Sequence, residues 1–289
     1  MGLYATFRRI NVGGTDFDAL TEDRVVAMVR DALRRGAGGR IITPNVDILR
    51  QARTDPGVRA HLADATLVVA DGMPLVWASQ LAGSPLPERV AGSSLLWSLS
   101  YGLGLDGRSV FVLGGDPPAA GTAAGAVRAA RRITAGCPGL RVAGTLSPRY
   151  GFDRDPAHLD RVCAEVVAAR PDLVLVGLGF PKQERIIDRL RARMPAAWFL
   201  GCGAAVNFAA GDQLRAPLWM QRSGLEWAHR LGTEPRRLAG RYLCHDAPYA
   251  LRLLATTAAA RHAVSRRTSP GRALPRRPAS RRAVPLPAR

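Results

Sequence analysis

The clearest candidate for chemistry in this sequence is Asp71, which directly follows a short apolar run. Residues 67–70 (Leu-Val-Val-Ala) are too few for a helix and indicate a strand buried on both faces of a parallel sheet. Ligands of open α/β sheets bind outside the carboxyl ends of the strands, where Asp71 would lie. The alternative is that Asp71 only caps the helix expected to begin near Met73.

A stiff and then cationic loop comes next in the chain. Pro85 and Pro87 precede Arg89, and the small residues at 92–94 lead into another expected helix. The helix start offers free backbone N–H groups, so this loop could present Arg89 to an anion. The alternative is a surface ion pair between Arg89 and Glu88 or another acid.

Polar or glycine-rich residues follow three other expected strands. Thr43 and Asn45 follow one strand, Gly114 and Gly115 follow another, and the segment 177–184 (GLGFPKQE), with Gly179 and Gln183, follows a third. Glycine lets a ligand approach the backbone closely. The last segment reads G-x-G-x-x-K and not G-x-G-x-x-G, so the dinucleotide fingerprint of a nicotinamide enzyme is missing.

The sequence predicts neither a metal nor a cofactor. Four cysteines and five histidines are scattered without metal-ligand spacing. Asp153 and Asp155 spell D-x-D, a metal-binding pattern in many glycosyltransferases, but Asp155 precedes Pro156 as an N-cap precedes a helix. We therefore interpret this pair as structural.

Strands and helices alternate along the first 203 residues, which predicts a mostly parallel, Rossmann-like sheet with helices on both faces. The expected strands are 7–12, 40–43, 66–70, 109–113, 140–143, 173–176 and 198–200, and the expected helices are 21–35, one after Asn45, 73–82, 94–103, 117–135, 156–169 and 182–193.

The organisation changes after residue 203. We expect a loop over 204–216 and helices over 218–231 and 235–260, together a basic helical appendage that completes the site. Residues 261–289 hold nine arginines and no acid, half of the formal net charge of +18, and should form a disordered tail. No apolar stretch is long enough to span a membrane.

Several blocks of the sequence closely resemble the WecG/TagA/CpsF family of bacterial glycosyltransferases. They are TPNVDIL (43–49), ADGMPLVWAS (70–79), LPERVAGSSL (86–95), VFVLGG (110–115), GLGFPKQE (177–184), and the run from GAAVNFAAG through RAPLWMQRSGLEWAHRL to EPRRLAGRYL (203–243). The resemblance covers roughly residues 8–245. It implies an inverting, metal-independent transfer of a hexose or an N-acetylhexosamine, or its uronate, from a UDP-sugar to a polyprenyl-diphosphate-linked sugar.

The resemblance also implies roles for individual residues. Asp71 matches the proposed general base, Thr43 and Asn45 match positions of the sugar and acceptor pocket, and Arg89 and Gln183 match active-site positions. We assign Arg89 to phosphate contact and Gln183 to the sugar or diphosphate; a solvated residue in the first turn of a helix is the alternative for Gln183. The remaining expected substrate-binding residues are Gly114, Gly115, Gly179, Asn207, Arg230, Arg236, Arg237 and Arg241.

The partners follow from the same resemblance. We expect a cytoplasmic protein held peripherally on the inner leaflet, because aromatic residues and arginines alternate in the appendage; a homo-oligomer is possible. Two alternatives stay open at this point: an NAD-type oxidoreductase, which the missing fingerprint disfavours, and a charge-driven nucleic-acid binder. The second is disfavoured because the basic excess lies mostly in the tail, so no nucleic-acid partner is expected.

Overall fold

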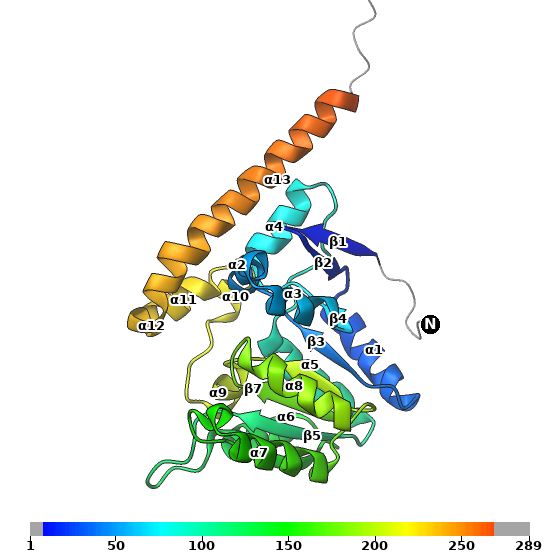
Figure 1. Cartoon of the computed structure of the whole chain (residues 1–289), viewed down its shortest axis with the longest axis vertical. Coiled ribbons are helices and arrows are strands. Elements are labelled where there is room, and N and C mark those ends of the chain that lie inside the picture. Colours follow the sequence, from blue (N-terminus) through cyan, green and yellow to red (C-terminus); the bar gives the residue numbers. More distant parts are fainter. Residues whose placement is uncertain (1–7, 269–289) are drawn as a thin grey trace, which may run out of the picture.

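A single sheet of six parallel strands forms the centre of the computed structural model (Figure 1). The structure describes residues 8–268, with the side chains at 218, 222, 237 and 262–268 left out. The strands lie in the order β4 (Leu67–Val68), β3 (Gly39–Ile42), β8 (Trp198–Gly201), β7 (Leu173–Gly177), β5 (Ser109–Gly114), β6 (Arg141–Leu146). Since every pairing in this sheet is parallel, all six carboxyl ends meet at one edge.

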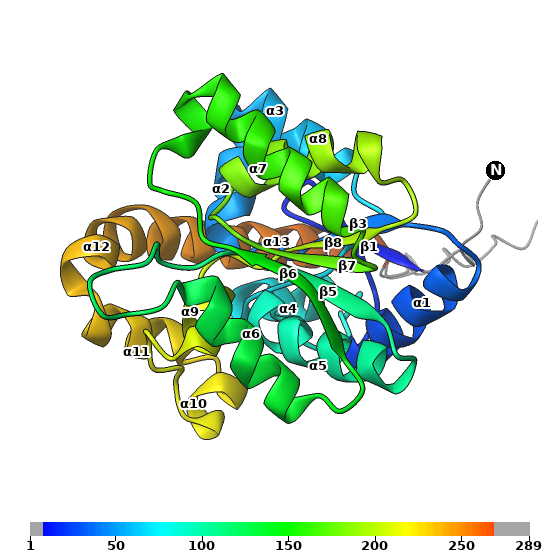
Figure 2. The ribbon, with the colours of Figure 1, turned by 90° about the horizontal axis from the view of Figure 1, so that it is seen from below.

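The strands are apolar throughout because helices cover both faces of the sheet. In β5, Val110 and Val112 join the core on one face, while Phe111 and Leu113 join the core on the other. Figure 2 shows the sheet edge-on between the two layers. One layer contains α1 (Glu22–Arg34), α5 (Gly92–Leu105), α6 (Gly125–Gly136) and α9 (Ala205–Ala210), and the other contains α7 (Pro156–Ala169) and α8 (Lys182–Arg193).

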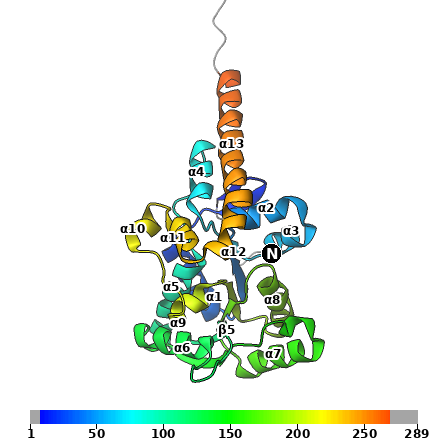
Figure 3. The same cartoon turned by 90° about the vertical axis from the view of Figure 1, so that its left-hand side faces the viewer.

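A third apolar cluster covers the β3–β4 end of the sheet. It is built from the antiparallel hairpin β1 (Arg9–Val12) and β2 (Thr15–Asp18) and from α2 (Val46–Thr54), α3 (Pro56–Ala63), α4 (Met73–Leu81) and α13 (Ala247–Thr268). Leu253 brings α13 into this cluster. The helix then continues away from the body of the protein as a single rod (Figure 3).

The chain between α9 and α13 consists of short helices gathered on one side of the sheet (Figure 1). They are α10 (Leu218–Arg222), α11 (Glu226–Thr233), α12 (Pro235–Ala239) and a π-helical segment, η2 (Gly240–Asp246), that leads into α13. Among residues 8–268, none of the helices combines the length and the apolar composition of a membrane span.

The predicted parallel α/β class is confirmed, but several element boundaries are wrong. The helix expected over 117–135 begins only at Gly125, because two prolines (Pro117 and Pro118) and Gly121 at φ +73° hold the preceding segment as a loop. The sequence interpretation also missed β2 and α3. The single helix expected over 218–231 breaks at Gly224, where φ is +79°.

Two corrections concern the appendage and the tail. The expected loop 204–216 contains α9, whose Ala205, Val206 and Ala209 are buried; six residues are too few to show a helical period. Helix α13 continues through residues 261–268, which the sequence interpretation assigned to the disordered tail. The rest of that prediction, 269–289, lies outside the described residues.

Candidate active site

Asp71 lies immediately beyond β4 at the carboxyl edge of the sheet. Its backbone N–H donates to the carbonyl of Pro44, which follows β3, and Ala70 accepts a hydrogen bond from Val90. These two bonds tie the ends of β3 and β4 to the loop that carries Arg89. The N-cap position of α4 is held by Gly72 at φ +143°, with no side-chain capping bond, so the capping alternative for Asp71 is wrong.

Arg89 faces Asp71 and also binds an acid from the appendage. Its Nη1 lies 3.6 Å from Asp71 Oδ1 and 3.0 Å from Glu226 Oε2, at the start of α11. The side chain of Glu88, the alternative partner, instead accepts the backbone N–H of Glu22. Arg89 is therefore mostly buried within a cluster and is not part of a surface pair.

Glu226 is the centre of this cluster, and the sequence interpretation missed it. Besides Arg89, its carboxylate meets Arg230 Nη2 at 3.2 Å and Arg215 Nε at 3.9 Å. Arg215 also donates to Ser94 Oγ at 2.9 Å, near the start of α5. The available signal was an acid four residues before Arg230 on the expected helix, which favours an ion pair.

The cluster shifts the pKa values of its two carboxylates in opposite directions: that of Asp71 is raised and that of Glu226 is lowered. Burial raises the pKa of Asp71; Arg89 opposes this shift and Glu226 adds to it. Burial also raises the pKa of Glu226, but Arg230, Arg89 and Arg215 outweigh it and leave that pKa lowered. Asp71 keeps 29% of its side-chain surface exposed, so the more basic carboxylate is also the more accessible one.

Thr43 and Asn45 lie beside Asp71, beyond the end of β3. Thr43 is buried, and its Oγ1 would lie 3.0 Å from a Cβ placed on Gly92, so the start of α5 approaches it closely. Asn45 is the N-cap of α2 and accepts the Ile48 N–H at 3.0 Å, a bond that leaves its amide NH₂ group unused. Their expected contact with substrate stays a prediction.

A second group of predicted residues lies at the ends of β5 and β7. Gly114 and Gly115 have φ values of +125° and +72°, and a Cβ on Gly114 would collide with the Gly177 backbone. Asp116 follows them and accepts from Asn207 Nδ2 at 3.3 Å and from the exposed Tyr150 hydroxyl at 2.9 Å. This group gives the edge a second set of polar side chains.

Gly179 and Gln183 complete this side of the edge. Gly179 has φ +81° in the turn before α8. Gln183 is buried, so the solvated alternative is wrong; its Oε1 accepts the Gly203 N–H at 3.1 Å. The guanidinium of Arg230 lies 4.8 Å from the Phe208 ring centroid, so α9, which also carries Asn207, contacts the cluster around Asp71.

Another predicted arginine of the appendage, Arg241, lies beside α2 and not beside Asp71. Arg241 has Nη1 at 3.9 Å from Asp47 and Nε at 3.7 Å from Asp246, beside α2. Arg236 is exposed, and the side chain of Arg237 is outside the described set. Arg230, in contrast, belongs to the cluster around Glu226 beside Asp71.

The D-x-D pair is structural, as predicted: Asp155 caps α7 by accepting the N–H groups of Ala157 and His158. Asp153 lies 3.8 Å from Lys182. Within residues 8–268, no group of three or more His, Cys, Asp or Glu is placed to hold a metal ion.

The site thus contains Asp71, a carboxylate with a raised pKa, and the guanidinium groups of three arginines at the carboxyl edge of a parallel sheet. This arrangement is typical of α/β enzymes that act on anionic substrates. Comparison with known proteins makes the assignment specific. The model of the Glycosyl transferase WecG/TagA/CpsF family matches residues 10–263. The chain belongs to this family and is a glycosyltransferase.

Two similar bacterial proteins share one name. An N-acetylglucosaminyldiphosphoundecaprenol N-acetyl-beta-D-mannosaminyltransferase of Bacillus spizizenii is 33% identical over 205 residues, which cover 71% of this chain and 75% of the relative. The Bacillus subtilis protein of the same name is 30% identical over 200 residues, or 69% and 73% of the two chains.

Proposed function

We propose that this protein transfers N-acetylmannosamine, or a closely related hexosamine, from a UDP-sugar to N-acetylglucosamine on a polyprenyl diphosphate. The named relatives support the sugar and the acceptor. The observation that carries the proposal is the placement of Asp71 opposite Arg89, with Arg215 and Arg230 around the shared Glu226. This pairing puts a base and a set of anion-binding groups within one site.

The transfer is a single inverting displacement. The acceptor hydroxyl loses its proton to Asp71 as its oxygen forms a bond to the anomeric carbon, and the bond from that carbon to the diphosphate oxygen breaks. UDP leaves with the electron pair of that bond. A carboxylate with a raised pKa suits this task, because a base works best when its pKa is near the working pH.

The leaving diphosphate is neutralised by side chains, and no metal is required. Arg89, Arg215 and Arg230 supply planar guanidinium groups that match phosphate oxygens. In the free protein Glu226 occupies all three, so the diphosphate competes with Glu226 for them.

The protein works at the inner face of the cell membrane, where a polyprenyl-linked acceptor would lie. Trp219 and Trp227, on α10 and α11, are exposed, and the same part of the chain carries Arg215, Arg230, Arg236 and Arg241. An apolar and cationic surface of this kind favours an anionic bilayer interface. Sedimentation with anionic but not with zwitterionic vesicles tests this part of the proposal.

The central experiment measures UDP release from a panel of UDP-sugars with a short-chain polyprenyl-diphosphate N-acetylglucosamine as acceptor, in EDTA. We expect acceptor-dependent release with one donor.

Asp71→Asn should keep the fold and UDP binding but lower turnover about 100-fold or more, the scale of losing a general base. Asp153→Asn is the matched control, because it alters the D-x-D pair and should stay active. An active Asp71→Asn protein would remove Asp71 from this role, and loss of activity in EDTA or in Asp153→Asn would refute metal independence.

A further inference from the structure

Three polar side chains form a buried line behind the active-site edge. Arg40 of β3 and Glu184 of α8 are fully buried, and Gln183 beside Glu184 is 4% exposed. Ionised side chains are costly to bury unless they are paired. None of the proposed catalytic steps uses Arg40 or Glu184, so their burial calls for a different explanation.

The inner end of the line fixes the Gln183 amide. Gly203 N–H can only donate, so the Gln183 atom that it meets at 3.1 Å must be the oxygen. The amide nitrogen then faces the other way and donates to Glu184 Oε1 at 3.2 Å. Gly203 lies just beyond β8, which is between β3 and β7 in the sheet. Glu184 therefore acts on the edge through Gln183.

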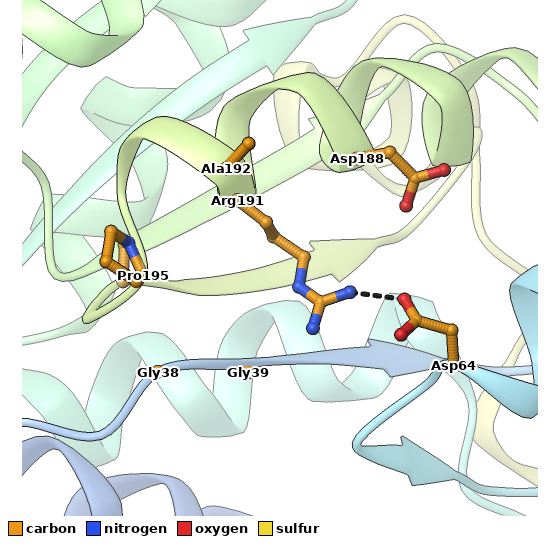
Figure 4. Close-up of a pocket in the computed structure, with 8 residues that line it drawn as sticks. Gly38, Gly39, Asp64, Asp188, Arg191, Ala192 and Pro195 are labelled. Atoms are coloured by element: carbon orange, nitrogen blue, oxygen red, sulfur yellow. Dashed lines mark hydrogen bonds and ion pairs between the residues drawn. The ribbon is translucent and has the colours of Figure 1, made fainter.

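At the outer end of the line, Arg40 pairs with Glu184 by charge and not by a hydrogen bond, and Glu184 Oε2 has no hydrogen-bond partner among the described residues. Arg40 Nη1 lies 3.9 Å from Glu184 Oε2 and 2.5 Å from Asp188 Oδ1, while Nη2 donates to the His61 carbonyl at 2.6 Å and lies 3.1 Å from Asp64. Asp188 and Asp64 line a cavity of about 350 Å³ at the amino ends of β3 and β8 (Figure 4). The line thus connects the two ends of the sheet.

The end of β8 leaves space for this arrangement. A Cβ on Gly201 would lie 2.5 Å from Gln183 Nε2 and would also collide with Glu184 Oε1. Burial raises the pKa of Glu184 to about 7, and the charge of Asp188 also raises this pKa. The charge of Arg40, the hydrogen bond from Gln183 and the charge of Arg191 act in the opposite direction. The charge on Glu184 thus depends on its cation, Arg40.

We propose that Glu184, held by Arg40, is a positioning residue of this glycosyltransferase: it orients the Gln183 amide and thereby sets the Gly203 loop at the substrate edge. Glu184 does not touch substrate. The expected effect on turnover rests on the proposed function. The expected effect on the Gly203 loop does not.

The test combines hydrogen exchange at the Gly203 amide with a double-mutant cycle. Glu184→Gln keeps the shape of the side chain and removes the charge that Arg40 holds. We expect Gly203 exchange to become ~10-fold faster, because the Gln183 amide then donates to a neutral acceptor instead of a charged one, and kcat to fall by a similar factor with an unchanged donor KM. In the Gln183→Ala background, Glu184→Gln should cause no further loss, because its effect passes through Gln183.

Asp188→Asn covers the case in which Glu184→Gln does not fold, since the Asp188 side chain is 42% exposed. It should speed Gly203 exchange as well. Asp160→Asn on α7, which breaks a pair 3.1 Å long with Arg189 of α8, is the control and should change neither readout. Unchanged Gly203 exchange in the charge variants, or additive losses in the cycle, would overturn the inference. A wild-type protein inactive on every donor would instead refute the proposed function, and exchange would still decide the role of Glu184.

Discussion

Removal of the charge on Glu226 should destabilise the free protein and increase its response to diphosphate. Glu226→Gln leaves three guanidinium groups facing one another without their shared anion. Removing one partner of a fully buried ion pair costs about 3–5 kcal/mol, and exposed pairs contribute about 0–1 kcal/mol. The side chains of Glu226, Arg89 and Arg230 are 10%, 15% and 30% exposed, between these limits. We therefore expect a loss of roughly 2 kcal/mol, or about 4–8 °C in Tm for a chain of this size.

The decisive measurement is Tm with and without UDP. UDP should raise the Tm of Glu226→Gln by more than it raises that of the wild type, because in the variant the diphosphate no longer competes with Glu226. Glu165→Gln, the same substitution on the exposed face of α7, is the control and should match the wild type. An unchanged Tm in Glu226→Gln, or an equal UDP response, would refute the competition between Glu226 and the diphosphate.

The same variant should shift the pH dependence of turnover. Glu226 helps to raise the pKa of Asp71, so its removal lowers that pKa. A base is active when deprotonated, and the acid limb of the kcat/KM profile should therefore move to lower pH. A shift toward higher pH, or none, would contradict the role of Asp71 as the base that this limb reports.

Three further perturbations test other parts of the structure. Gly224→Ala places a Cβ 2.6 Å from the Met73 side chain, at a residue with φ +79°, and should lower kcat by displacing α11. Gly232→Ala is the control, because its Cβ meets nothing within 4 Å. Equal rates in the two variants would contradict the close packing of α4 and α11. Arg40→Met leaves Glu184 buried without its cation and should lower the urea-derived unfolding free energy by about 3–5 kcal/mol at a pH where Glu184 is ionised. A loss below about 1 kcal/mol would show that Glu184 takes up a proton when Arg40 is absent. Asp246 has its pKa raised to about 6 by burial and by Asp47, so the native state binds its proton more tightly than the unfolded state, and wild-type stability falls as pH rises from about 4 to 6. In denaturant titrations, the stability of Asp246→Asn relative to the wild type should therefore increase over that range. A decrease would mean that the pKa of Asp246 is lowered in the native state and not raised.

The sequence predicted the position of those candidate residues that depend on local order. Asp71 and Arg89 lie at the sheet edge as expected, because one follows a strand directly and the other follows in a loop stiffened by prolines. Thr43, Asn45, Gly114 and Gly115 follow from the same rule, since the ends of parallel strands share one edge. The predicted Asp155 cap was correct because the pattern Asp-Pro carries its own local geometry.

The residues that sequence reasoning missed depend on contacts distant in the chain. Glu226 lies 137 residues from the Arg89 that it binds, and no local pattern encodes such a pairing. Gln183 was expected near substrate or in solvent, but its burial depends on the absence of a side chain at Gly201. Helix α9 was taken for a loop because its burial against α6 and α5, and not its composition, holds it.

The position of Glu226 changes what the appendage does. Arg215, Glu226 and Arg230, three of the four groups whose charges act on Asp71, all follow residue 204, and the fourth, Arg89, is bound by Glu226 itself. Without these helices, Asp71 would keep only Arg89 of the four groups whose charges shift its pKa. In the proposed mechanism, the sheet supplies the position of the base Asp71, while the helices that dock at its edge supply charges that shift its pKa and that can bind a leaving diphosphate. The proposal therefore predicts that Asp71 acts as a base only while α11 is docked against Arg89.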